Sequence, residues 1–196
     1  MFLFAIIGSS PPKYKQAIVS ENILQQIGED DPDAFKEFYE ITQKTLYSYI
    51  LSIVTNQHDA EDILQETYLK IRAAAHLYEP QGKPMAWVFT IAKNLSYMHL
   101  RRQKKILDTG IDEMENHSIF SNRLVQEDKI LLETVLLELE EIERSIILLH
   151  AVSGFKHREI SKNLCIPLPT VLSKYYRGLK KLKKSISHSI RGKHEQ

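Results

Sequence analysis

Apolar residues recur every three or four positions along most of this chain, which is the spacing of one face of an α-helix. No segment shows the strict alternation of apolar and polar residues that is typical of a half-buried strand. The first long apolar pattern follows Asp31-Pro32-Asp33, a helix-start signal with acids near the positive end of the helix dipole. We therefore expect an all-α fold whose first long helix ends at about Val54.

Two more helices are expected before residue 106. After a break at 56–58, Asp59 can cap a helix that runs from Ala60 to about Leu77. A loop with two prolines and Gly82 follows, and a third helix covers about 85–104 and ends in basic residues.

The pattern fades between 106 and 123 and then returns, which predicts a flexible linker between two small helical domains. Helices are expected in the second domain at about 126–139, 142–152, 157–164 and 170–186, with Gly154 capping the second of them. The predicted organisation is an N-terminal arm at 1–20, a first domain at 21–105, the linker, a second domain at 124–190 and a basic tail at 191–196.

The segment 157–176 has the form of a helix-turn-helix. Its second helix carries an apolar stripe at spacings of four, four and three: Val171, Tyr175, Leu179 and Leu182. The opposite face is basic and hydroxyl-bearing, which suits a DNA major groove. Cys165 stands in the turn, where a positive φ is expected, and Pro169 is tolerated at a helix entrance.

The net charge of +1 conceals a polarised chain. From 171 to 196 there are eight Lys or Arg against one acid, whereas 124–143 holds seven acids and one Lys. A concentrated basic stretch attracts phosphate backbones whatever the net charge, although charged helix faces also simply keep proteins soluble.

Several classes of protein find no support in the residues. The single Cys165 excludes an internal disulfide, and the eight His show no metal-binding spacing. No glycine-rich phosphate loop or catalytic triad is present, so we expect no cofactor, no metal and no enzyme activity. The apolar start at 2–7 is too short to span a bilayer, and we expect a cytoplasmic protein that is not inserted in the membrane.

Three ordered motifs resemble those of bacterial RNA polymerase sigma factors of the extracytoplasmic-function type, in the sigma-70 family. They are DAEDILQETY at 59–68, WVFTIAKNL at 87–95 followed by LRR at 100–102, and the segment 154–177. The resemblance covers roughly four-fifths of the chain and implies sigma domains two and four, with no domain three between them.

The resemblance implies a role for each motif. Core RNA polymerase would bind the first, through Asp59, Glu61, Asp62, Gln65 and Glu66. Downstream promoter DNA would be opened and held by the second and the loop before it, through Tyr78, Gln81, Lys83, Lys93, Asn94, His99, Arg101 and Arg102. The upstream promoter element would be read by Thr170, Ser173, Lys174, Arg177 and Lys181. An anti-sigma factor is a further candidate partner.

A different class of protein stays open as an alternative. A stand-alone helix-turn-helix regulator that binds an operator without polymerase would account for the second domain. It leaves the motif at 59–68 and the basic third helix without a role, and such regulators usually dimerise. We see no heptad seam that would support a dimer.

Overall fold

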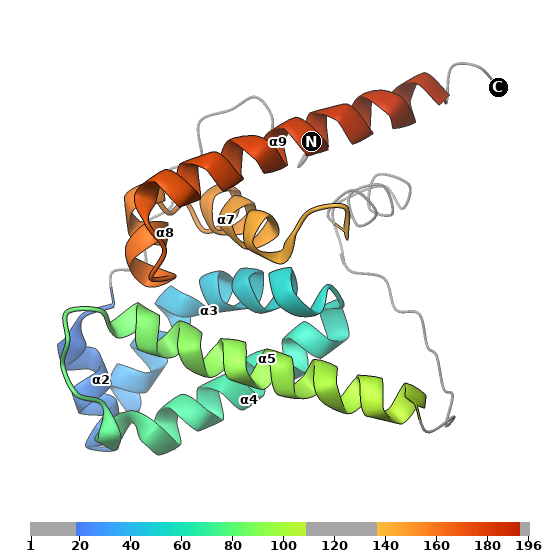
Figure 1. Cartoon of the computed structure of the whole chain (residues 1–196). Coiled ribbons are helices and arrows are strands. Elements are labelled where there is room, and N and C mark those ends of the chain that lie inside the picture. Colours follow the sequence, from blue (N-terminus) through green and yellow to red (C-terminus); the bar gives the residue numbers. More distant parts are fainter. Residues whose placement is uncertain (1–18, 109–136, 193–196) are drawn as a thin grey trace.

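The computed structural model describes residues 19–108 and 137–192, and throughout these two ranges the regular elements are helical. Helices α2 to α5 form a lower group in Figure 1, and α7 to α9 lie across it as a second layer. The first group contains α2 (Glu21–Gly28), α3 (Pro32–Val54), α4 (Gln57–Ala74), the 3₁₀ turn η1 (Ala75–Leu77) and α5 (Pro84–Asp108). The second contains α7 (Glu141–Ala151), α8 (His157–Asn163) and α9 (Leu168–Gly192). The expected all-α fold is confirmed.

Helix α3 begins where its start signal predicted. The carboxylate of Asp31 accepts hydrogen bonds from the backbone N–H groups of Asp33 and Ala34, and Pro32 occupies the first turn, where its missing N–H costs nothing. The helix ends at Thr55, whose φ of 59° is left-handed. Phe38, Leu46 and Ile50 lie on its buried side and are fully enclosed.

The predicted cap of the next helix is wrong. Helix α4 starts three residues earlier than expected, and Asn56 caps it by accepting a hydrogen bond from the N–H of Asp59. Asparagine is as good a cap as aspartate, and the left-handed Thr55 already supplies the break in the chain. The side chain of Asp59 is therefore left for contacts with α5. The α-helix was also expected to continue to Leu77, but its last three residues form the 3₁₀ turn η1 instead.

The last two residues of the segment predicted as an N-terminal arm take part in the fold. Val19 is buried in the core, and Ser20 caps α2 by accepting a hydrogen bond from the N–H of Ile23. Helix α2 then buries three apolar side chains against its neighbours: Ile23, Leu24 and Ile27. The folded part of the chain thus includes the last two residues of the expected arm. Residues 1–18 lie outside the described part.

The helix-turn-helix forms as predicted. Cys165 has a φ of 54° in the turn, and α9 starts at Leu168 with Pro169 in its first turn. Gly154, just after α7, also has a left-handed φ, of 74°. The N–H of the next residue, Phe155, donates a hydrogen bond back to the carbonyl of Leu149 in the last turns of α7. Ile147, Ile160, Val171 and Leu182 fill the core between the three helices.

The predicted linker begins too early, because α5 continues to Asp108. The remainder of the linker and most of the helix expected at 126–139 lie outside the described residues. Helix α9 runs further than expected, to Gly192. Within the described ranges, none of the helices combines the length and the apolar character that crossing a membrane requires.

The two helical groups pack directly against each other, mainly through α7 and α3. The buried guanidinium of Arg144 donates from Nε to the carbonyl of Ser52 at 2.6 Å, in the last turn of α3. That carbonyl belongs to the negative end of a helix dipole, where a cation is favourable. The hydroxyl groups of Ser52 and Ser145 also lie 2.6 Å apart, and Tyr97 on α5 donates to Glu141 at 2.7 Å.

We expect Arg144→Met to lower the free energy of unfolding by about 2 kcal/mol, because the buried carbonyl of Ser52 loses a charged donor. We also expect a larger radius of gyration, since the two groups lose a polar link. Urea denaturation and small-angle X-ray scattering measure the two effects. Ser145→Ala is the matched control, and it should cost about 1 kcal/mol or less because it removes one neutral contact. An unchanged stability of Arg144→Met would contradict this account of the interface.

Candidate nucleic-acid interface

The outward face of α9 differs from the one expected from the sequence. Ser173, Tyr176, Arg177 and Lys180 are exposed, and Tyr176 retains 64% of its accessible surface. Thr170 is half-buried at the start of the helix and accepts a hydrogen bond from Ser173 through its carbonyl. Val171 and Leu182 point the other way and are buried. A phenol, a guanidinium and an ammonium group thus share one exposed strip of the helix.

Two of the lysines expected on this face are engaged elsewhere. Lys174 donates to Glu140, and Lys181 Nζ lies 2.7 Å from Glu143, whose side chain is fully buried. The hydrogen bond from Lys174 and its positive charge hold the pKa of Glu140 below its usual value. These lysines therefore fasten α9 to the acidic start of α7 in this structure.

Tyr176 and Lys180 were missed by the sequence reasoning. Helical spacing gave the buried stripe correctly, but it did not show that acids from another helix would draw two lysines aside. The sequence did contain a signal for this pairing, because an acidic stretch at 124–143 precedes a basic helix. Positions 173, 176, 177 and 180 follow the three- and four-residue spacing of a single face.

A cluster of aromatic rings joins the three helices of the second group behind this face. The rings of His150 and His157 stack with centroids 4.5 Å apart, and Tyr175 meets both of them edge-on. His150 Nδ1 lies 2.7 Å from the carbonyl oxygen of Phe155. Burial, with a smaller contribution from His150, lowers the pKa of His157. The cluster thus favours an uncharged His157.

Exposed basic and amide groups line one side of α5. Asn94, Arg101 and Arg102 are exposed, as any group that reaches DNA must be. Lys93 is also exposed but borders the cleft between the two helical groups, and its Nζ lies 5.7 Å from the ring centroid of Tyr97. His99 lies apart from this set, because its Nε2 is 3.1 Å from Asp59 on α4.

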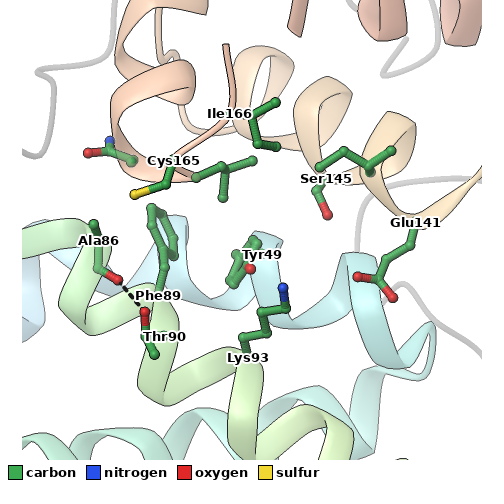
Figure 2. A pocket seen from close by; sticks show the side chains of 12 residues that line it. Tyr49, Ala86, Phe89, Thr90, Lys93, Glu141, Ser145, Cys165 and Ile166 are labelled. Carbon is green, nitrogen blue, oxygen red and sulfur yellow. Dashed lines mark hydrogen bonds between the residues drawn. The ribbon is translucent and has the colours of Figure 1, made fainter. Parts of the chain in front are cut away.

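The cleft itself has a volume of about 220 Å³. Figure 2 shows Tyr49, Phe89 and Lys93 on one wall and Glu141, Ser145 and Cys165 on the other. The two walls come from different helical groups, so this cavity exists only while α7 and α8 rest on α3 and α5. It is smaller than the usual pocket for a drug-sized ligand.

The loop before α5 holds the remaining residues expected to meet downstream DNA. Gln81 and Lys83 are exposed, whereas Tyr78 is half-buried and packs against Trp87 with ring centroids 5.3 Å apart. The hydroxyl of Tyr78 donates to Glu21 at 3.1 Å. Trp87 is partly buried against the core.

A separate face on α4 gathers the acidic and amide side chains of the first motif. Asp62, Gln65 and Glu66 are exposed, and Leu69 continues the same strip with 69% of its surface accessible. Glu61 is exposed beside them and accepts a hydrogen bond from Gln57. An exposed leucine inside a polar rim is typical of a protein-binding surface.

Asp59 does not belong to this strip. One of its carboxylate oxygens lies near His99, and the other accepts a hydrogen bond of 2.9 Å from Gln103. The residue therefore ties α4 to α5.

Comparisons with known proteins agree with this two-part layout. A family model described as Sigma-70 region 2 matches residues 38–106, and one described as Sigma-70, region 4 matches residues 129–182. Together the two matches span more than half of the chain.

Relatives and solved structures agree with the family matches. The chain is 26% identical over 176 residues to the ECF RNA polymerase sigma factor SigW of Bacillus subtilis (strain 168), covering 83% of this chain and 94% of the relative. Among solved structures, CnrH in complex with the cytosolic domain of CnrY aligns with a TM-score of 0.64 at 18% identity, covering 86% of this chain and 97% of that one. The sigma factor RpoE in complex with the anti-sigma factor NepR from Bartonella quintana aligns with a TM-score of 0.63 at 23% identity, covering 78% and 96%. Both structures have the same fold as this chain.

We expect the stability of the helix-turn-helix group to fall in mild acid. Because the pKa of His157 is lower in the folded protein than in the unfolded chain, unfolding takes up a proton. The stabilisation is complete above the unfolded pKa of about 6.5 and is lost as the pH falls through the folded value. Denaturant unfolding between pH 7.5 and 5 measures the slope. His157→Phe should flatten it, whereas His76→Gln, at an exposed histidine of η1, should leave it unchanged. An equal slope in His157→Phe would assign the pH dependence to other groups.

Proposed function

Because this chain belongs to the sigma-70 family, in its extracytoplasmic-function group, we propose that its two helical groups divide the work of a promoter-recognition subunit. The chain binds core RNA polymerase and directs promoter recognition, DNA opening and transcription initiation. In this proposal it has no catalytic activity of its own and acts in the cytoplasm beside the polymerase. The observation that carries the proposal is the exposed strip of α9, the second helix of the helix-turn-helix, which presents Ser173, Tyr176 and Arg177 together.

The strip on α9 has the chemistry of a major-groove reader. Arg177 can donate two hydrogen bonds to one guanine edge, Tyr176 offers an apolar ring to a thymine methyl group, and Ser173 can bond bases or phosphates. Lys180 lies one turn further along and suits a phosphate. Lys174 and Lys181 join the contact only by leaving Glu140 and Glu143, so we assign them a smaller share of the specificity.

The first helical group supports the other two contacts. The strip formed by Asp62, Gln65, Glu66 and Leu69 suits a partner surface that pairs an apolar pocket with basic groups. Asn94, Arg101 and Arg102 on α5, with the loop at 78–83, suit a single strand whose bases are unstacked. Asp59 and His99 hold α4 and α5 together, and this keeps the two surfaces in a constant relation.

An anti-sigma factor is a candidate partner as well. The structural neighbour RpoE is in complex with the anti-sigma factor NepR, and CnrH is in complex with the cytosolic domain of CnrY. In this chain the polar link between Arg144 and Ser52 already holds the helical groups together. A partner that bound across both groups would gain from that preformed arrangement.

The defining test is run-off transcription with purified bacterial core polymerase on a pool of genomic promoter fragments from the host. Discrete transcripts that appear only with this protein would establish the role, and their shared upstream sequences would give the promoter code. Absence of transcripts, together with no co-purification with core, would favour a stand-alone operator-binding regulator.

We expect Leu69→Ser to weaken binding to core polymerase by about tenfold, because truncating an apolar anchor at an interface costs more than about 1 kcal/mol. Leu77→Ser is the matched control, since Leu77 is also 69% exposed but lies in η1, away from the strip. Fluorescence anisotropy of labelled protein titrated with core measures both affinities. Equal affinities for the two variants would remove Leu69 from the polymerase contact.

We expect Arg177→Ala to lower promoter-specific initiation by about tenfold, because one base-edge contact contributes about 1–3 kcal/mol of discrimination. Lys174→Ala should have a smaller effect, since its ammonium is paired with Glu140, and the double variant should abolish specific initiation. Run-off transcription and core-binding assays are compared, with Lys36→Ala on the exposed side of α3 as control. A parallel loss of core binding would show that the two groups do not divide the work in this way.

A further inference from the structure

Helix α2 lies outside the residues that match the sigma-70 region 2 model, which begin at residue 38. It nevertheless packs along η1 and the loop that leads into α5. Ile23, Leu24 and Ile27 anchor it in the core, and Ser20 caps its first turn. The position of α2 is therefore held firmly, independently of the loop.

The first residue of α2 reaches across to the loop at two points. The carboxylate oxygen Oε1 of Glu21 accepts a hydrogen bond from the hydroxyl of Tyr78 at 3.1 Å and a second from the backbone N–H of Gly82. Gly82 has a φ of 72°, and a side chain there would meet nothing within 4 Å. Glycine is therefore favoured at this position by its left-handed backbone conformation, which directs its N–H toward Glu21, and not by a lack of space for a side chain.

The far end of the same helix also touches the chain entering the loop. A Cβ atom added at Gly28 would lie 2.9 Å from the backbone nitrogen of His76 and 3.0 Å from its Cα. Contact this close requires glycine. Helix α2 thus contacts the segment from η1 to Gly82 through both of its ends: Glu21 at its start bonds to Tyr78 and Gly82, and Gly28 at its end packs against His76.

The two hydrogen bonds to Glu21 come from Tyr78 and Gly82, and the residues between them, 79–81, face solvent. Gln81 is exposed between the two anchored positions, and Lys83 is exposed just after them. The loop has no helix or strand of its own at 78–83. Burial, and then the hydrogen bond and charge of Glu21, raise the pKa of Tyr78, and its hydroxyl stays protonated as a donor.

We propose that Glu21 is a positioning residue that sets the loop at 78–83 in the shape that receives an unpaired base of the opened promoter strand. The inference rests on the proposed function. Ordering a loop costs conformational entropy, and a loop that is ordered before DNA arrives does not incur that cost at the binding step. Glu21 itself is placed beneath the loop and need not touch DNA.

The test uses complete holoenzyme, assembled from core polymerase and the full chain, on a promoter with a fluorescent base analogue in its downstream element. Glu21→Ala removes both hydrogen bonds and should slow promoter opening by about tenfold. Glu21→Gln keeps the acceptor oxygen and should stay within about twofold of the wild-type rate. Gln25→Ala, at an exposed position of the same helix, is the matched control and should have no effect.

A second readout separates positioning from general stability. Glu21→Ala should also lose discrimination among bases at one position of the downstream element, while its affinity for core and its choice of upstream element stay unchanged. Tyr78→Phe keeps the ring beside Trp87 and loses only the hydroxyl. It should slow opening by about threefold, and it serves the test if Glu21→Ala fails to fold.

The outcomes are distinct. Opening and base discrimination that are normal in Glu21→Ala, or in Tyr78→Phe where only that variant folds, would overturn the inference and leave the proposed function standing. A premelted promoter should restore the rate of Glu21→Ala, and no restoration would also overturn the inference. A wild-type protein that directs no initiation with core would overturn the proposed function, and this inference with it.

Discussion

The contact between Arg144 and the carbonyl end of α3 determines how the rest of the molecule is arranged. A buried guanidinium is costly unless charge and hydrogen bonding compensate it, and the last turn of α3 offers a backbone carbonyl at the negative end of a helix dipole. Glu141 at the start of α7 adds a second link by accepting a hydrogen bond from Tyr97, and burial, followed by that hydrogen bond, raises the pKa of Tyr97 to about 12. Because these are directional polar contacts, they select one orientation of α7 on α3, where apolar packing alone would allow several.

The acidic start of α7 also determines which lysines of the basic helix α9 are exposed. Glu140 and Glu143 at the beginning of α7 draw Lys174 and Lys181 inward, and α9 is held in place by charge as well as by Val171 and Leu182. Arg177 and Lys180 stay exposed on the outward strip. One set of acids therefore both anchors the helix and selects which part of its basic surface is offered to DNA.

The exposed surfaces that carry the proposed function lie on three elements held by one scaffold. The strip with Leu69 belongs to α4, the basic side to α5, and the reading strip to α9, and Asp59 joins the first two through His99 and Gln103. Two modest DNA contacts on one platform gain affinity through effective concentration when both can engage their sites together. Helix α2 extends this scaffold to the loop before α5, through Glu21 at one end and Gly28 at the other.

The sequence by itself determined the helical class, most helix positions and the turn at Cys165, because periodicity, caps and left-handed positions are local properties. It also placed the strip from Asp62 to Glu66 and the outward positions of Ser173 and Arg177. It could not decide between Asn56 and Asp59 as a cap, since both suit that position and only the pairing of Asp59 with α5 separates them. Only the tertiary structure decided that Lys174 and Lys181 turn toward α7, that Glu21 grips the loop, and that the two helical groups share an interface. Each of these depends on residues from 34 to 92 positions apart, and helical periodicity carries no information about which distant side chains meet.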